Sequence, residues 1–230
     1  KSIKPLVIGK GSISGVNLKK YNVKKSFAKE RLRNKKNFLK KKFKNILLEE
    51  NISCKTVFGF VGRLNIDKGI CELIDAFELH NKKFKNSFLL LIGPNELDQD
   101  TYKKISTVRN CFHLEFIKDI HLIIPCLSCL VLPSYREGFG SVLIEAAASR
   151  VPIIASDIPG PRDFVKHLYN GYLVNPKNVS NLKEGLDYLV KHTKKSSKFA
   201  ERAFILCTKY YSENYVSRLF VDELTKDSKF

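Results

Sequence analysis

Residues 129–156, CLVLPSYREGFGSVLIEAAASRVPIIAS, contain one complete strand, loop, helix and strand pattern. The apolar runs CLVLP (129–133) and VPIIAS (151–156) are typical of short buried strands. Between them a loop with two glycines leads into a helical pattern over about residues 140–149. This order predicts a β-α-β unit, in which both strands lie parallel in one sheet.

The same alternation continues on both sides of this unit. Runs rich in β-branched, aromatic and aliphatic residues predict strands at 55–62, 87–93, 111–117 and 171–174. Apolar residues at helical spacing predict a helix from about residue 70, with Asp67 as its N-cap. Further helices are predicted at about 97–108, 119–127, 160–167, 179–193 and 196–226. We therefore expect an α/β fold, a Rossmann-like parallel sheet with helices on both faces, followed by carboxyl-terminal helices.

The composition is that of a globular protein. The 230 residues are 43% apolar and 28% charged, and no apolar run is long enough to cross a membrane. The chain contains no methionine, which suggests a processed product or a fragment. Cys126 and Cys129 form a C-x-x-C pair that runs into a predicted strand. We expect core cysteines there rather than a redox or zinc site.

Positive charge is concentrated near the amino terminus. The formal net charge is +18, and residues 1–50 hold 16 basic and 3 acidic side chains. Leu39, Phe43, Ile46 and Leu47 share one helical face, so this segment is predicted to be a basic amphipathic helix. It could be a solvated surface helix, or it could face anionic lipid headgroups. Nucleic acid is the third alternative, but no nucleic-acid motif accompanies the charge, so we expect no such partner.

Ligands of a parallel α/β sheet bind at the carboxyl ends of its strands, so the loops there carry the chemistry. GRLNIDKG (62–69) places Arg63 and Lys68 beside the start of a helix, which suits a diphosphate. Two ordinary surface bases are the alternative. GPNE (93–96) follows the next strand and could form a pocket wall.

The loop PSYREGFG (133–140) carries the densest signal. Gly138 and Gly140 allow the backbone to come close to a ligand, and the following helix is expected to offer unpaired N–H groups to an anion. Glu137 and Glu145 lie eight positions apart, which favours hydrogen bonds to two separate sets of hydroxyls. A glycosidase pair is the competing interpretation, because such enzymes also use two carboxylates. ASDIPGPRD (155–163) could close the same cleft. The helix-opening N–H groups belong to Ser141, Val142 and Leu143.

In this order, GRL-x3-KG, PSYREGFG-x4-E, VPIIASDIPGPRD and NGYLV resemble the motifs of glycosyltransferase family 4. The resemblance extends from about residue 5 to about residue 192. It implies one half of a GT-B fold, the carboxyl-terminal, donor-binding domain of a retaining enzyme that uses a nucleotide sugar. The half that usually supplies a catalytic histidine and most of the acceptor site is not matched. None of the five histidines matches that position, so we expect them to be structural.

The resemblance also implies boundaries and roles. Residues 1–20 would be a remnant of the inter-domain junction, 21–50 the basic helix, 51–194 the nucleotide-sugar-binding domain and 195–230 the terminal helices. Arg63 and Lys68 would hold the donor diphosphate, Glu137 the sugar hydroxyls and Glu145 the ribose. Of these four residues, the catalytic candidates are Arg63, Lys68 and Glu137. The other donor-binding candidates are Gly62, Gly93, Phe116, Ile117, Gly138, Phe139, Gly140, Ser141, Val142 and Leu143.

We therefore expect transfer of a hexose, most simply from a UDP-sugar and without a metal or other cofactor, to a lipid-linked saccharide. The pathway would be the assembly of a bacterial surface polysaccharide, whether O-antigen, capsule or exopolysaccharide. The location would be the cytoplasm, peripheral on the inner face of the membrane. A half-subunit active only with a separate partner chain, a non-catalytic basic binding module, and a sugar-phosphate synthase or phosphorylase are the alternatives. With the other domain absent, the apolar residues Val7, Ile8, Ile13, Val216, Leu219, Phe220 and Leu224 should be partly exposed.

Overall fold

The computed structural model describes residues 15–21 and 56–227. In these residues six strands form one sheet in the order β3-β2-β1-β4-β5-β6. Every neighbouring pair is parallel, as the sequence predicts. The strand bounds are Thr56–Val61 for β1, Ser87–Ile92 for β2, Cys111–Leu114 for β3, Cys129–Leu132 for β4, Ile153–Ser156 for β5 and Tyr172–Val174 for β6.

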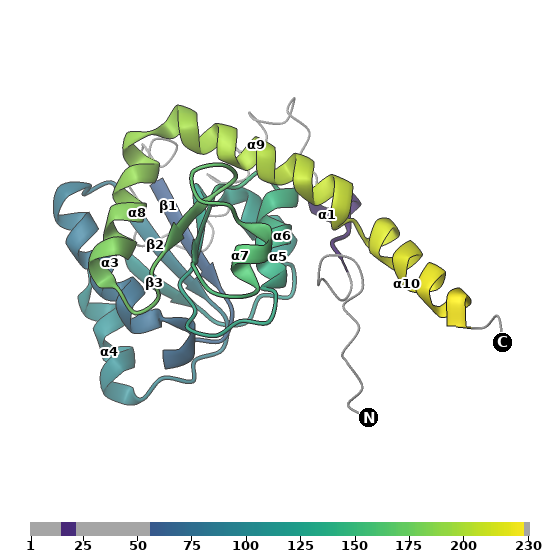
Figure 1. Ribbon diagram of the computed structural model, residues 1–230. Coiled ribbons are helices and arrows are strands. Elements are labelled where there is room, and N and C mark those ends of the chain that lie inside the picture. The colour runs from purple at the N-terminus through teal and green to yellow at the C-terminus, as the bar shows by residue number, and fades with distance from the viewer. Residues whose placement is uncertain (1–14, 22–55, 228–230) are drawn as a thin grey trace.

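Helices cover both faces of the sheet (Figure 1), so the Rossmann-like fold class is confirmed. On one face lie α3 (Ile70–Lys83) and α4 (Gln99–Thr107), and α8 (Val179–Lys191) returns to pack on α3. On the other lie α5 (Ile120–Ile123) with the 3-10 turn Ile124–Cys126, α6 (Ser141–Ala148) and α7 (Pro161–Phe164). The long helix α9 (Thr193–Tyr210) packs on α6.

The carboxyl-terminal stretch, expected to be helical over about 196–226, forms two helices, α9 and α10. The helical conformation is interrupted at Tyr211 and Ser212, between α9 and α10 (Glu213–Asp227). Helix α10 extends away from the sheet in Figure 1. Val16 N–H donates to the Tyr211 carbonyl at 2.8 Å, and Glu213 N–H donates to the Val16 carbonyl at 3.0 Å. These bonds with a distant segment, together with the buried Tyr211 ring, replace the helical pairing. Periodicity alone could not reveal them.

The exposure expected of the apolar residues near the termini is only partly observed. Val216 is buried, against expectation, whereas Leu219 and Phe220 are half-buried and Leu224 is exposed. Val7, Ile8 and Ile13 lie outside the described residues, and so does the predicted basic helix except for Tyr21. Tyr21 ends the short helix α1 (Leu18–Tyr21), which packs on α5 and α6.

The core consists of the strands and the inner faces of the helices. All six residues of β2 are buried, as expected for a strand covered on both sides. Cys126 and Cys129 are buried, which confirms the core interpretation of the C-x-x-C pair. Burial raises the pKa of the Cys111 thiol to about 12. In the described segments, no group of three metal-ligating side chains occurs and no helix is long and apolar enough to span a membrane.

Candidate functional site

The candidate site lies at the carboxyl ends of β1 and β4. The chain leaves β1 toward β2 and β3 and then returns to β4 on the opposite side, so neighbouring loops diverge here. Such a reversal of strand order opens a crevice in parallel α/β sheets. The loops after β1 and β4, residues 62–69 and 133–140, lie at this reversal. They carry Arg63, Lys68 and Glu137, the residues expected from the sequence to be catalytic.

The loop after β1 is held by side-chain capping and by a close backbone approach. Asn65 caps the 3-10 turn Ile66–Lys68 by accepting from the Lys68 N–H at 3.1 Å. Gly69 has φ +69 and precedes α3; a Cβ there would lie 2.2 Å from the Pro133 carbonyl oxygen. Asp67 is therefore not the N-cap of α3, and that prediction is wrong. Its carboxylate contacts Arg136 at 2.7 Å instead.

Lys68 and Glu137 form the central ion pair of the site. Their Nζ and Oε2 atoms are 2.6 Å apart, and the two side chains are only 19% and 17% exposed. Ser134 Oγ donates to the same carboxylate oxygen at 3.3 Å. The Tyr135 N–H donates to the Asp67 carbonyl at 2.8 Å, so the two loops are also joined through the backbone. A shielded ion pair such as this one is positioned to exchange partners with a charged ligand.

Arg63 does not contact Lys68 or Glu137 but bonds to the loop after β2. Its Nη1 atom lies 3.1 Å from Glu96 Oε1, and Asn65 Nδ2 donates to Glu96 Oε2 at 2.9 Å. These bonds hold the pKa of Glu96 below its usual value, with the Asn65 bond as the main cause. The Arg63 side chain is 62% exposed, so its guanidinium is accessible. Sequence reasoning missed Glu96 as a partner because the contact is long-range.

The loop after β4 leads into α6 through glycine. Gly140 has φ +79 and serves as the N-cap of α6 without a side-chain bond. Among the described residues no partner contacts the N–H groups of Ser141 and Val142. The Leu143 N–H, in contrast, donates to the Gly140 carbonyl at 2.8 Å. The expectation of three unpaired N–H groups is therefore wrong for Leu143, because the glycine turn already pairs it.

Glu145 lies in the second turn of α6 and faces the short helix α1. Tyr21 of that helix donates a hydrogen bond to the Glu145 carboxylate. Burial raises the pKa of Glu145, and the Tyr21 bond offsets part of that rise. Burial also raises the pKa of the Tyr21 hydroxyl. The first residue of the segment expected to be the basic helix thus reaches a candidate donor-binding residue.

The Phe139 side chain points away from the site. Its ring stacks on Tyr211 with centroids 5.3 Å apart, and Phe164 packs edge-on against both rings. Burial raises the pKa of Tyr211 to about 12. Only the backbone of Phe139 is therefore free to face a ligand, which is the role the resemblance implies. The aromatic cluster also ties this loop to the break between α9 and α10.

The remaining predicted residues follow the carboxyl ends of the neighbouring strands β2 and β3. Gly93 packs so closely that a Cβ would lie 2.1 Å from the Gly62 carbonyl oxygen. Phe116 and Ile117 follow the end of β3; Phe116 is 75% exposed and Ile117 half-buried. Among the described residues, neither Phe116 nor Ile117 forms a hydrogen bond, ion pair or ring contact with Lys68, Glu137 or Glu145. Their proposed place beside the base of the nucleotide stays a prediction.

The histidines are tied into the scaffold. His80 is fully buried, with Nδ1 at 2.7 Å from Asp187 Oδ1 and Nε2 at 2.9 Å from Ser87 Oγ. Burial lowers the pKa of His80. His113 Nε2 bonds to the Gly93 carbonyl at 2.7 Å. His80 lies at the amino-terminal end of β2, remote from the candidate site, and so fits the structural role expected from the sequence.

The turn 157–163 packs on the β4 loop through Gly160. This residue has φ +88, and a Cβ there would lie 2.0 Å from the Gly138 carbonyl oxygen. A Cβ on Gly138, in contrast, would meet nothing within 4 Å. We expect Gly160→Ala to lower stability by about 1–3 kcal/mol, because the backbone must shift. We expect Gly138→Ala to leave the melting temperature unchanged but to weaken nucleotide binding.

For Gly160→Ala and Gly138→Ala, thermal unfolding gives the melting temperature and calorimetric titration gives the affinity for UDP. Equal melting temperatures for Gly160→Ala and the unmodified chain would contradict the close contact. Unchanged UDP affinity in Gly138→Ala would show that no ligand approaches this backbone.

The chain is similar in sequence to known glycosyltransferases. A family model described as "Glycosyl transferases group 1" matches residues 40–205. The capsular polysaccharide biosynthesis glycosyltransferase CapM of Staphylococcus aureus is 32% identical over 194 residues, which are 83% of this chain and 47% of CapM. The chain spans about half the length of the curated relatives it matches.

Solved structures share the fold. Anabaena HepE, in complex with UDP and glucose, superposes with a TM-score of 0.77 at 21% identity, covering 92% of this chain and 55% of HepE. The carboxyl-terminal domain of the group 1 glycosyl transferase LpcC from Francisella tularensis gives a TM-score of 0.72 at 25% identity. That match covers 86% of this chain and 99% of the LpcC domain.

Proposed function

Since this chain belongs to the family of glycosyl transferases group 1, we propose that it binds the donor of a sugar-transfer reaction, a nucleoside diphosphate sugar. The observation that carries the proposal is the shielded Lys68–Glu137 pair beside the unpaired N–H groups of Ser141 and Val142. A cation and two helix-opening N–H groups in one crevice favour a diphosphate.

The role of each side chain follows from its charge and burial. Lys68 and the exposed Arg63 would bind the diphosphate and stabilise the negative charge that develops on it as the sugar leaves. Glu137, released from Lys68 as the phosphates bind, would accept hydrogen bonds from the sugar hydroxyls. The backbone of Gly138, Phe139 and Gly140 would line this pocket. Glu145 would accept the ribose hydroxyls, and Phe116 and Ile117 would border the base.

The finer assignments belong to the same proposal. UDP is favoured as the nucleotide, since HepE, which shares the fold, was crystallised with UDP and glucose. CapM acts in capsular polysaccharide biosynthesis, which supports a surface polysaccharide as the product. We propose transfer with retention of configuration to a lipid-linked saccharide, at the cytoplasmic face of the membrane and without a metal. The anomeric configuration of the product, measured by NMR, tests retention.

A binding screen tests the donor assignment directly. UDP, GDP, ADP and their sugars are titrated calorimetrically into residues 1–230, with and without added Mg²⁺. We expect one nucleotide to bind selectively and without a requirement for the metal. The absence of binding by every nucleotide would overturn the proposal.

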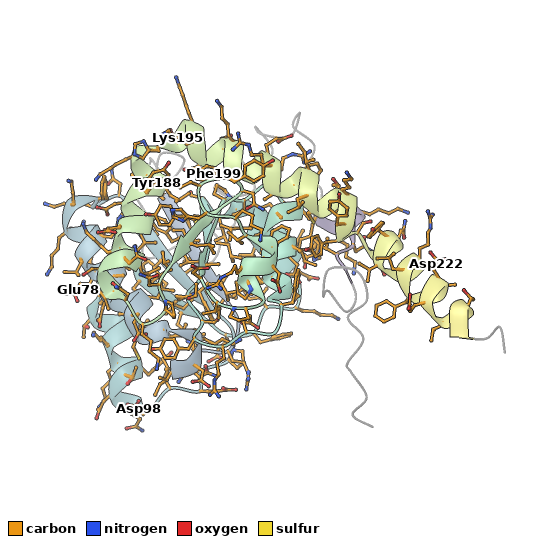
Figure 2. The ribbon with its side chains drawn as sticks, in the orientation of Figure 1. Glu78, Asp98, Tyr188, Lys195, Phe199 and Asp222 are labelled. Atoms are coloured by element: carbon orange, nitrogen blue, oxygen red, sulfur yellow. The ribbon has the colours of Figure 1, made fainter. Side chains whose placement is uncertain are left out.

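Glu145→Gln is expected to weaken UDP binding about tenfold or more, because hydrogen bonds to a charged group contribute roughly 1.5–3 kcal/mol each. Glu78→Gln, on the exposed surface of α3 (Figure 2), removes the same charge far from the site and should have no effect. Calorimetry gives both affinities. An unchanged affinity in a folded Glu145→Gln variant would exclude this role.

The pH dependence of UDP binding tests whether the ionised carboxylate of Glu145 contributes. Burial raises the Glu145 pKa, so its carboxylate takes up a proton at a higher pH than an ordinary glutamate. As the pH falls through that raised pKa, the unmodified chain should lose more UDP affinity than Glu145→Gln does. The phosphate titration of UDP is common to both proteins and cancels in the comparison. Parallel pH profiles would contradict a role for the ionised carboxylate.

A further inference from the structure

The outer surface of α9 is strongly basic. At 100° per residue, six exposed residues of this helix fall within an arc of about 100°. The opposite side, with Phe199, Ala200, Ala203 and Cys207, is buried. In Figure 2 Lys195 lies at the outer side of α9, and Phe199 stacks on Tyr188 of α8. The six outward residues are Lys194, Lys195, Lys198, Arg202, Ile205 and Lys209.

The excess of basic residues is specific to the part of the chain that contains α9. Residues 177–209 hold eight basic and three acidic side chains, whereas the other residues from 51 onward hold 17 of each sign. The one acidic residue of α9, Glu201, pairs with Arg150 at 3.3 Å. Among the described residues, none of the five outward cations of α9 is in an ion pair. They are available to an anionic partner.

A strained turn beside α9 adds apolar side chains to this surface. Leu168 has φ +57, a left-handed conformation that is costly for leucine. The turn is fixed by bonds from the Leu168 N–H to the Gly171 carbonyl at 2.8 Å and from the Lys166 N–H to Asn170 Oδ1 at 2.6 Å. Leu168 and Tyr169 are nevertheless 45% and 55% exposed. The fold thus holds two large apolar side chains in water at a conformational cost.

Arg202 joins the turn to the helix. Its Nη1 atom donates to the Tyr169 carbonyl at 3.1 Å, and its guanidinium lies 4.6 Å from the centroid of the Tyr169 ring. Ile205, on the same face of α9, is 57% exposed. We define the α9 patch as the six outward residues of α9 together with Leu168 and Tyr169. The contacts of Arg202 with Tyr169 place the turn beside the outer face of α9, so apolar side chains lie near its cations.

We propose that the α9 patch binds the surface of an anionic lipid bilayer. The cations would contact headgroup phosphates, and Leu168, Tyr169 and Ile205 would enter the interface between headgroups and acyl chains. Cations combined with exposed apolar side chains are typical of interfacial binding, whereas binding to a nucleic-acid backbone uses the cations alone. A second copy would bring together two surfaces of the same charge. The proposal does not depend on the sugar-transfer function.

The absence of tryptophan from the sequence allows a position-specific test. In the full chain, Ile205→Trp places a single indole in the α9 patch, and Leu79→Trp places one at an exposed site on α3. Emission is recorded with vesicles of phosphatidylcholine alone and of phosphatidylcholine mixed with phosphatidylglycerol. We expect a blue shift for Ile205→Trp with the anionic vesicles only, reversed by high salt, and no shift for Leu79→Trp. This readout is separate from binding by residues 19–44, which carry no indole in either variant.

Charge variants complete the test. In the Ile205→Trp background, changing Lys194, Lys195 and Lys198 to Gln should lower vesicle affinity at the patch about 100-fold, since each cation contributes about fivefold. A matched triple change of exposed lysines elsewhere, Lys82, Lys103 and Lys118 to Gln, should have little effect.

Four outcomes would overturn the proposal. The first is the absence of a shift for Ile205→Trp with anionic vesicles. The second is an equal shift for Leu79→Trp, which would indicate nonspecific adsorption. The third is a shift with a nucleic-acid oligomer but not with vesicles. The fourth is a shift that grows with protein concentration without lipid, which would indicate self-association.

Discussion

Lys68→Met is expected to weaken UDP binding to residues 1–230 by about 10- to 100-fold. A hydrogen bond to a charged group contributes roughly 1.5–3 kcal/mol, and Lys68 is largely shielded from water. The variant also leaves the Glu137 carboxylate without its cation, 17% exposed and close to the incoming diphosphate. Repulsion between that carboxylate and the phosphates adds to the loss.

We expect Arg63 to contribute less than Lys68 to UDP binding. Arg63 is 62% exposed and its partner Glu96 is 38% exposed, so both its attraction to phosphate and its present ion pair are weakened by water. Arg63→Met should therefore weaken binding less than Lys68→Met. Calorimetric titration with UDP, with melting temperatures as a check on folding, measures the order. A larger effect at Arg63 would show that the diphosphate lies at the exposed side of the loop.

A double variant separates the two contributions to the Lys68 effect. If Glu137 repels the phosphates once Lys68 is lost, Lys68→Met with Glu137→Gln should bind UDP more tightly than Lys68→Met alone. Lys104→Met is the matched control, because Lys104 is also paired with a carboxylate, that of Asp75, but lies on α4. It should bind UDP normally. Strictly additive effects of the two site substitutions would exclude coupling between Lys68 and Glu137 at the ligand.

The sheet and the two principal loops could be predicted because their signals are local. A strand such as SFLLLI is apolar throughout, since helices cover both of its faces, and all six of its side chains are buried. The glycine at position 140 likewise predicts a turn that leads into a helix, and Gly140 has φ +79 at the N-cap of α6. Both features depend on residues that are neighbours in the sequence, so pattern and structure agree.

The partners of the charged residues could not be predicted because they come from distant segments. Asp67 is a residue type that often caps helices, but its carboxylate bonds to Arg136, 69 residues away in the sequence. Asn65 caps the 3-10 turn Ile66–Lys68 instead. The break at Tyr211 depends on Val16, and the Glu145 environment depends on Tyr21. In each case a tertiary contact overrides a local preference. The charge balance of the site is therefore a property of the fold rather than of any motif.

Residues 1–230 alone are expected to bind the donor but to transfer no sugar. In the proposed function, Lys68, Arg63, Glu137 and Glu145 would bind the donor and stabilise the leaving diphosphate. Each described side chain that we assign to the site serves the donor rather than the acceptor, and positioning of the acceptor can supply a factor of about 10⁵ or more in rate. His80 and His113, the histidines with the most extensive hydrogen bonds, are engaged in the scaffold. The chain also spans only about half of CapM.

The measurement is a transfer assay with a radiolabelled UDP-sugar and a lipid-linked saccharide. Residues 1–230 are assayed alone and fused behind the amino-terminal half of CapM, and UDP binding is measured in both proteins. We expect equal UDP affinity, with transfer confined to the fused protein. Equal binding identifies the donor site as intact, so the lack of transfer by residues 1–230 cannot result from misfolding. Robust transfer by residues 1–230 would contradict the prediction and would require an acceptor-positioning group within this chain. Tyr21, which bonds to Glu145, and His121, whose ring packs edge-on against Tyr21, would be the first candidates.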